Sequence, residues 1–129
     1  MSVVRLAFVD GGDGNDTIIG SRIADVLRGG SGNDRITGGR GDDLLTGGSG
    51  YDSFVFAAGF GRDVIADFSA GAGLGDVIEL DRVFAGFASL SAASQQIGAD
   101  VVITADASNT ITLKNVLLSS LNADDFLFR

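Results

Sequence analysis

G-G-D-G-N-D-T-I-I, beginning at Gly11, is the first of five consecutive nine-residue copies that fill residues 11–55. The next four read GSRIADVLR, GGSGNDRIT, GGRGDDLLT and GGSGYDSFV, and they begin at Gly20, Gly29, Gly38 and Gly47. Aspartate occupies the sixth place of every copy, and a large apolar residue occupies the eighth. A fixed period of this kind indicates a stacked repeat structure, in which each copy contacts only its neighbours.

The third copy, Gly29–Thr37, shows how one unit folds. Its glycines permit a tight turn, because they accept positive φ and close backbone approach. The three residues that follow the aspartate can form only a very short strand, with Ile36 directed inward. Such a strand is stable only when neighbouring copies stack on it. Two copies make one coil of turn, strand, turn, strand. Copies one, three and five therefore turn at one edge (the odd edge), and copies two and four turn at the other (the even edge).

The sixth-place aspartates predict a cation site. Asp16, Asp34 and Asp52 stack on the odd edge at about 5 Å, the spacing of strands in a sheet, and Asp25 and Asp43 stack on the even edge. Like charges at that separation repel unless a cation lies between them. Carboxylates and turn carbonyls supply the roughly six to eight hard oxygens that Ca²⁺ prefers. Zinc would require His or Cys, and the sequence contains neither.

Composition excludes several other functions. The net charge is −8, with sixteen Asp but only one Glu, which argues against nucleic acid and anionic membrane as partners. No apolar run reaches transmembrane length, so we expect no membrane insertion, and residues 1–8 lack the features of a cleaved signal peptide. Without His, and with Lys114 as the only Lys, a Ser–His or Ser–Lys nucleophile is unsupported. We expect no enzyme within these residues.

A set of β-hairpins closed by Gly-Gly and Asp-Gly turns is the alternative to a stacked repeat. Such turns have no reason to keep aspartate in phase with a period of nine through all five copies. The pattern therefore favours calcium over generic turns.

Residues 11–55 resemble the RTX, or hemolysin-type, calcium-binding nonapeptide GGxGxDxUx. The resemblance implies an all-β fold, a right-handed parallel β-roll of two short-stranded sheets with calcium at both edges. It also implies side-chain ligands at the sixth place and backbone carbonyl ligands elsewhere in each turn. The side-chain ligands would be Asp16, Asp34, Asp43 and Asp52. The backbone ligands would be Gly12, Gly14, Asn15, Gly30, Gly32, Asn33, Gly39, Gly41, Asp42, Gly48 and Gly50.

The second copy departs from this pattern. It loses two glycines and places Ile23 where the turn is tight, although Asp25 is retained. We expect a bent turn and a weaker metal site between Asp25 and Asp43. Intact neighbouring pairs predict about three calcium ions, a pair on the odd edge and a single ion on the even edge.

Beyond the repeats the composition changes. Residues 1–10 are expected to form an initial strand, and residues 56–129 a β-rich C-terminal region with one short helix that caps the roll. Apolar spacing predicts a helix over Arg82–Gln96 ended by Gly98. The remaining expected elements are strands at Val64–Phe68 and Val77–Leu80, a hairpin of Val101–Thr104 with Thr110–Leu113, and the apolar triplet Phe126–Phe128.

The resemblance extends, with less specificity, to the C-terminus. Gly61–Phe68 resembles the segment that closes such rolls, often with further calcium. Asp63 and Asp67 are therefore candidate ligands, the alternative being surface aspartates that flank a strand. Ala123–Phe128 is similar to the uncleaved C-terminal signals of type I secretion substrates, and Arg129 departs from that pattern.

The resemblance implies a secreted, extracellular bacterial module whose folding is driven by calcium after export. Its partners would be calcium ions, the type I secretion machinery and an upstream domain of a larger protein. One alternative is a polysaccharide-binding or enzyme-assisting module, as in some alginate epimerases, with Arg22, Arg28, Arg35 and Arg40 facing an acidic glycan. Another is calcium-dependent self-association in a surface layer or adhesin, through the exposed ends of a short roll.

Overall fold

The computed structural model describes residues 7–69 and 75–129, and in these ranges the chain forms two β-sheets. The seven-stranded sheet has the order β1 (Ala7–Asp10), β3 (Asp25–Arg28), β5 (Leu44–Thr46), β7 (Arg62–Ile65), β11 (Asn109–Leu113), β10 (Asp100–Asp106), β9 (Ser94–Ile97). The five-stranded sheet has the order β12 (Phe126–Phe128), β8 (Val77–Asp81), β6 (Ser53–Ala57), β4 (Arg35–Thr37), β2 (Thr17–Ile19).

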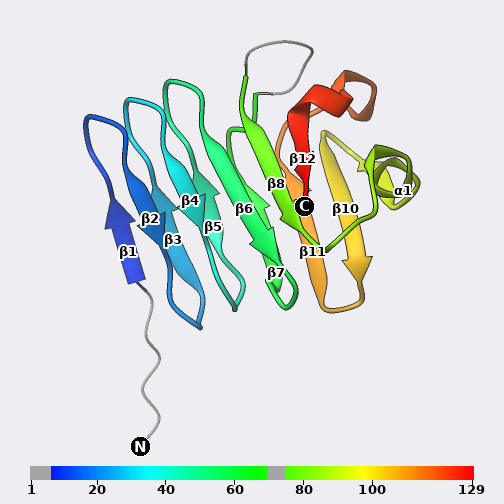
Figure 1. Cartoon of the computed structure of the whole chain (residues 1–129), viewed down its shortest axis with the longest axis horizontal. Coiled ribbons are helices and arrows are strands. Elements are labelled where there is room, and N and C mark those ends of the chain that lie inside the picture. Colours follow the sequence, from blue (N-terminus) through cyan, green and yellow to red (C-terminus); the bar gives the residue numbers. More distant parts are fainter. Residues whose placement is uncertain (1–6, 70–74) are drawn as a thin grey trace, which may run out of the picture.

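Successive repeats alternate between the two sheets, so each strand pairs with the strand two places away in the chain (Figure 1). Every pairing among β1 to β8 is parallel. In the repeats the register is eighteen residues, as in Ile18 with Ile36 and Leu27 with Leu45. This is the parallel β-roll that the sequence predicts, with turns along two opposite edges.

The core is the row of eighth-place side chains enclosed between the two sheets. Each repeat strand has its central residue buried and its flanking residues exposed or half-buried. The row continues past the repeats through Ile65 and Ile78, which are fully buried. Each short strand thus contributes one side chain, and stacking joins these side chains into a continuous core.

The C-terminal region closes one end of the roll. β11 pairs in parallel with β7 and then turns back as a hairpin with β10, and β12 adds in parallel to β8. The predicted hairpin is confirmed, and the apolar triplet Phe126–Phe128 forms the strand β12. The structure includes two 3₁₀ turns, Leu118–Ser120 and Ala123–Asp125, before β12.

The helix predicted over Arg82–Gln96 is wrong in extent. Only α1 (Phe87–Ala92) is helical, and Ser94–Ile97 forms β9 instead. β9 pairs antiparallel with β10, whose other edge is already bonded to β11. Pairing this open strand edge outweighs a weak helix preference.

Two other boundaries differ from expectation. β7 covers Arg62–Ile65 and ends before Asp67, because the chain turns there. Of the expected initial strand the structure describes only Ala7–Asp10, and the loop expected at Ser69–Gly75 lies largely outside the described residues. Arg129, which departs from the secretion-signal pattern, is part of the fold. Its backbone N–H donates to Leu80 O at 3.0 Å, and its guanidinium contacts Glu79 Oε1 at 2.9 Å.

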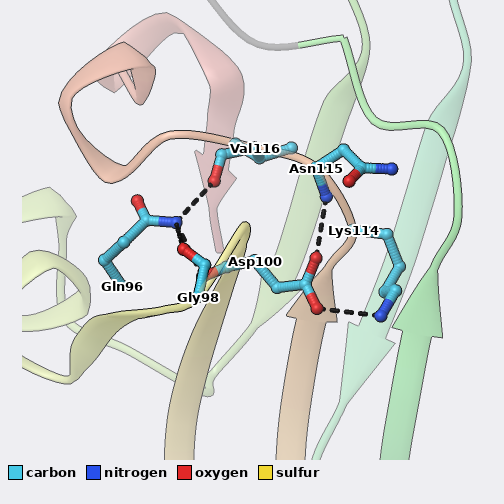
Figure 2. A network of polar contacts seen from close by, with 6 residues as sticks. All are labelled: Gln96, Gly98, Asp100, Lys114, Asn115 and Val116. Carbon is cyan, nitrogen blue, oxygen red and sulfur yellow. Dashed lines mark hydrogen bonds and ion pairs between the residues drawn. The ribbon is translucent and has the colours of Figure 1, made fainter.

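A polar network centred on Gln96 fastens the outer strands of the cap (Figure 2). Gln96 Nε2 donates to the carbonyl oxygens of Gly98, Asp100 and Val116 at 3.1, 2.9 and 3.1 Å. Its Oε1 accepts from the Leu118 N–H at 2.6 Å. Asp100 accepts from Lys114 Nζ at 2.8 Å and from the Asn115 N–H at 2.9 Å. One amide side chain therefore joins the β9–β10 turn to the loop after β11.

We expect Gln96→Ala to lower the free energy of unfolding by about 0.5–1.5 kcal/mol, because it removes four hydrogen bonds, of which three are exposed to solvent. Urea denaturation in saturating calcium measures the change. Gln95→Ala is the matched control, since Gln95 lies exposed on the same strand, and it should change stability by less than about 0.5 kcal/mol. Equal effects of the two substitutions would show that the network contributes nothing.

Candidate metal centre

The sixth-place aspartates form two ladders, one at each edge of the roll. On the odd edge the N–H of Asp16 donates to Asp34 Oδ1 at 2.8 Å, and the N–H of Asp34 donates to Asp52 Oδ1 at 3.0 Å. On the even edge the N–H of Asp25 donates to Asp43 Oδ1 at 2.9 Å. One oxygen of each acceptor carboxylate therefore links successive coils without any metal.

The second carboxylate oxygen of most ladder residues has no partner. Within the described residues, the unpartnered buried oxygens are Oδ2 of Asp16, Asp34, Asp43, Asp52 and Asp63. Four of these residues are at most 2% exposed, and Asp16 is half-buried. A buried carboxylate oxygen without a hydrogen bond is costly unless a cation or a proton compensates it. Two edges lined with such oxygens therefore fit hard cations.

At most of the turn glycines the neighbouring atoms leave no room for a side chain. A Cβ atom on Gly29 would collide with Asp34 Oδ2 and lie 2.6 Å from the carbonyl oxygen of Gly47. Gly30 and Gly32 have φ values of 92° and 103°, in the left-handed region. Their Cα atoms lie against carbonyl oxygens of the turn one coil earlier. The turns thus stack backbone on backbone, which brings carbonyl oxygens close to the aspartates.

In the described ranges no three carboxylates converge on one point. A cation at either edge would therefore take most of its ligands from turn carbonyls. This donor set, one or two carboxylates with several carbonyls, is one that Ca²⁺ accepts.

Comparison with known families agrees with this geometry. The family described as RTX calcium-binding nonapeptide repeat (4 copies) matches residues 8–22 and 19–54. Residues 8–54 are RTX calcium-binding repeats. The segment is thus a structural calcium-binding module, and the family implies Ca²⁺ as its ion.

Solved structures extend the likeness to nearly the whole chain. The extracellular lipase LipA from Serratia marcescens matches with a TM-score of 0.62 and 27% identity over 92% of this chain. The AlgE6R2 subunit of the mannuronan C5-epimerase from Azotobacter vinelandii matches with a TM-score of 0.61 and 28% identity over 93% of this chain. The chain spans 20% of the lipase chain and 91% of the epimerase subunit. No curated protein sequence matches the chain.

The RTX pattern continues beyond its fifth copy in two degenerate turns. Gly59 and Gly61 have positive φ, like the second and fourth glycines of a regular copy. Asp63 then occupies the sixth place, and its Oδ1 accepts from the Asp43 N–H at 2.8 Å. Asp63 thus joins the even-edge ladder, twenty residues after Asp43 rather than eighteen.

Asp76 is a ladder residue that the sequence interpretation missed. Its Oδ1 accepts from the Asp52 N–H at 2.9 Å, and its Oδ2 accepts from the Ser69 N–H at 2.9 Å. The sequence around Asp76 does contain the aspartate and eighth-place isoleucine of a repeat, which could have identified it. Asp67 is placed differently, because its two oxygens accept from the N–H groups of Gly47 and Gly48. Asp67 therefore closes the odd-edge turn of the fifth copy, which begins at Gly47, without joining the ladder.

The asparagines of the RTX turns have a second role. Asn15 Oδ1 accepts from the Asn33 N–H at 2.7 Å, and Asn33 Oδ1 accepts from the Tyr51 N–H at 2.9 Å. On the even edge Asp42 Oδ1 accepts from the Arg62 N–H at 2.9 Å. Fifth-place side chains therefore build a further ladder beside the aspartates. The assignment of carbonyl ligands to these turns stays a prediction.

Burial makes four of the ladder carboxylates difficult to ionise without a metal. Burial raises the pKa of Asp43 to about 7, that of Asp52 to about 6 and that of Asp63 to about 8. The pKa of Asp76 is raised by the same cause. Neighbouring aspartates add to the increase, as Asp25 does for Asp43.

These pKa values predict the pH dependence of the metal-free chain. A carboxylate whose pKa is higher in the folded state stabilises that state at low pH, and this stability is lost as pH rises through the folded-state pKa. We expect the calcium-free chain to be more stable at pH 5 than at pH 8 by on the order of a few kcal/mol.

Circular dichroism and urea denaturation in calcium-stripped buffer measure this difference. Asp43→Asn should reduce the pH dependence, because it removes one of the titrating groups. Greater stability at pH 8 than at pH 5 would contradict the prediction.

Proposed function

We propose that this chain is a calcium-driven folding module of a secreted bacterial protein. The observation that carries the proposal is the set of buried, unpartnered Oδ2 atoms repeated in phase along both edges. In the metal-free state these charges oppose stacking of the turns. Calcium compensates them, and the free energy of calcium binding then becomes free energy of folding.

The proposed setting is extracellular. Intracellular free calcium is too low to fill such sites, so the chain stays open enough to pass through a type I secretion channel. Outside the cell, calcium of roughly 10⁻⁴–10⁻³ M, the range in which extracellular modules bind, folds it. The match to an extracellular lipase, of which the chain spans 20%, supports a role as one module of a larger secreted protein. No helix in residues 7–69 or 75–129 is long and apolar enough to cross a membrane.

Calcium titration followed by circular dichroism tests the proposal. We expect β-structure to appear with Ca²⁺, to disappear with chelator, and to form poorly with Mg²⁺, which prefers a compact octahedral shell and retains its waters. A chain with the same spectrum in calcium and in chelator at neutral pH would refute calcium-driven folding.

A second candidate function, binding of an acidic polysaccharide, is favoured by a row of connected depressions on the even edge. The first contains Arg40 and shares Ala58–Phe60 with a second, which contains Arg82. The second shares Arg82 and Val83 with a third, of about 370 Å³, which contains Arg129. Asp106 also lines the second depression and would oppose an anion there. The epimerase subunit that this chain resembles comes from a mannuronan C5-epimerase.

The four arginines named from the sequence do not share one face. Arg28 lies on β3 in the seven-stranded sheet, and Arg35 lies on β4 in the five-stranded sheet, where it pairs with Glu79. Calorimetry with a short oligomannuronate at constant calcium separates the two surfaces. Arg40→Ala combined with Arg82→Ala should abolish binding, whereas Arg28→Ala should not. Absence of heat with the parent chain would eliminate the glycan function.

A further inference from the structure

The second RTX turn holds its aspartate with a serine. The Ser21 N–H donates to Asp25 Oδ2 at 2.6 Å, and Ser21 Oγ donates to Asp25 Oδ1 at 2.8 Å. Asp25 is buried and only 1% exposed. Asp25 is therefore a buried repeat aspartate whose two oxygens are both hydrogen-bonded within its own turn.

The backbone of this turn also differs from the others. No residue between Gly20 and Asp25 has positive φ, whereas the regular turns have two such glycines each. The stacking of carbonyls changes as well. A Cβ atom on Gly41 would meet the carbonyl carbon of Ile23 at 2.5 Å before its oxygen at 2.8 Å. In the regular turns the carbonyl oxygen is the nearest atom. The carbonyl group of Ile23 is thus displaced from the arrangement that the other turns repeat, whereas the Ser21 carbonyl oxygen remains the nearest atom to a Cβ on Gly39.

The next pair on the same edge has the opposite properties. Asp43 and Asp63 each have a buried Oδ2 without a partner. Their turns contain glycines with positive φ at the second and fourth places, which are Gly39, Gly41, Gly59 and Gly61. The features that suit a cation on this edge therefore occur one coil after Asp25.

We propose that Ser21 replaces calcium at the second turn, so that the calcium-binding turns of the even edge are residues 38–43 and 58–63. This inference rests on the proposed calcium-driven folding. A neutral N–H and hydroxyl satisfy the Asp25 carboxylate, and a cation there would have to displace both. The turn at residues 20–25 closes without metal, and the even-edge ion lies between the turns of Asp43 and Asp63 rather than between those of Asp25 and Asp43.

Counting bound calcium by native mass spectrometry of the whole chain tests this assignment. Asp25→Asn should leave the number of ions unchanged, and Asp63→Asn should lower it by one. Asparagine retains one oxygen, which can accept from the Asp43 N–H at residue 63 and can keep one of the two bonds from Ser21 at residue 25. Loss of an ion in Asp25→Asn, or a full count in Asp63→Asn, would overturn the assignment.

If Asp25→Asn fails to fold, a variant that is expected to gain a calcium site tests the same assignment. Ser21→Gly combined with Ile23→Gly restores both turn glycines and removes the serine hydroxyl. We expect this double variant to bind one more calcium ion than the parent, and an unchanged count would overturn the inference. Failure of the proposed function is distinct, because the circular dichroism spectrum of the parent chain would then be the same in calcium and in chelator.

Discussion

Gly29→Ala is expected to destabilise the calcium-bound module by roughly 2–4 kcal/mol. The residue is buried, and a Cβ atom on it would collide with Asp34 Oδ2 and lie 2.6 Å from the Gly47 carbonyl oxygen. A methyl group there must displace the aspartate, the next turn or both. Because Asp34 also accepts from the Asp16 N–H, its displacement would disturb the odd edge over two coils. Calcium titration with circular dichroism should show a higher midpoint and reduced β-structure.

Gly86→Ala is the matched control for this substitution. A Cβ atom on Gly86 meets nothing within 4 Å, and the backbone is extended at a φ of 178°. The free energy of unfolding of Gly86→Ala should differ from that of the parent chain by less than about 1 kcal/mol. If Gly29→Ala folded with the same calcium midpoint as the parent chain, the close packing of the turn against the carboxylate would contribute nothing to stability.

The repeats could be predicted from sequence because one rule recurs. In-phase aspartates and apolar residues fix the strand length, the eighteen-residue register and the buried row at the same time. A shift of one residue would bury charge and expose Ile36 or Leu45. Only the β-roll satisfies all copies together, so the fold followed from the pattern and from the resemblance to RTX repeats.

The cap could not be predicted in the same way, because its elements depend on distant partners. Residues 94–96 formed the end of the predicted helix, yet Ser94–Ile97 becomes β9 because β10 offers it an open edge. Asp76 lies twenty-four residues after Asp52, so the fixed period does not find it, and only the local spacing of Asp76 and Ile78 indicates a repeat there. The bonds from Ser21 to Asp25 depend on a local backbone conformation that a missing glycine signals but does not specify.

Leu45→Ala is expected to cost about 2–5 kcal/mol and to weaken calcium binding without altering a ligand. Leu45 is fully buried in the row of eighth-place side chains, between Leu27 and Ile65 in register. If calcium binding supplies the folding free energy, the lost core energy must be offset by more calcium. With about three ions bound on folding, a loss of about 4 kcal/mol raises the calcium midpoint about tenfold, since about 1.4 kcal/mol per ion is a factor of ten.

Leu44→Ala is a stringent control, because it makes the same chemical change at the adjacent residue. Leu44 points outward and is 41% exposed, and its contacts are cross-strand neighbours on the sheet surface, Val26 and Val64. Its loss should cost less than about 1 kcal/mol and shift the calcium midpoint by less than about twofold. Equal calcium midpoints for Leu45→Ala and the parent chain would show that the metal binds a module already folded. The buried carboxylates would then have to be compensated by something other than calcium.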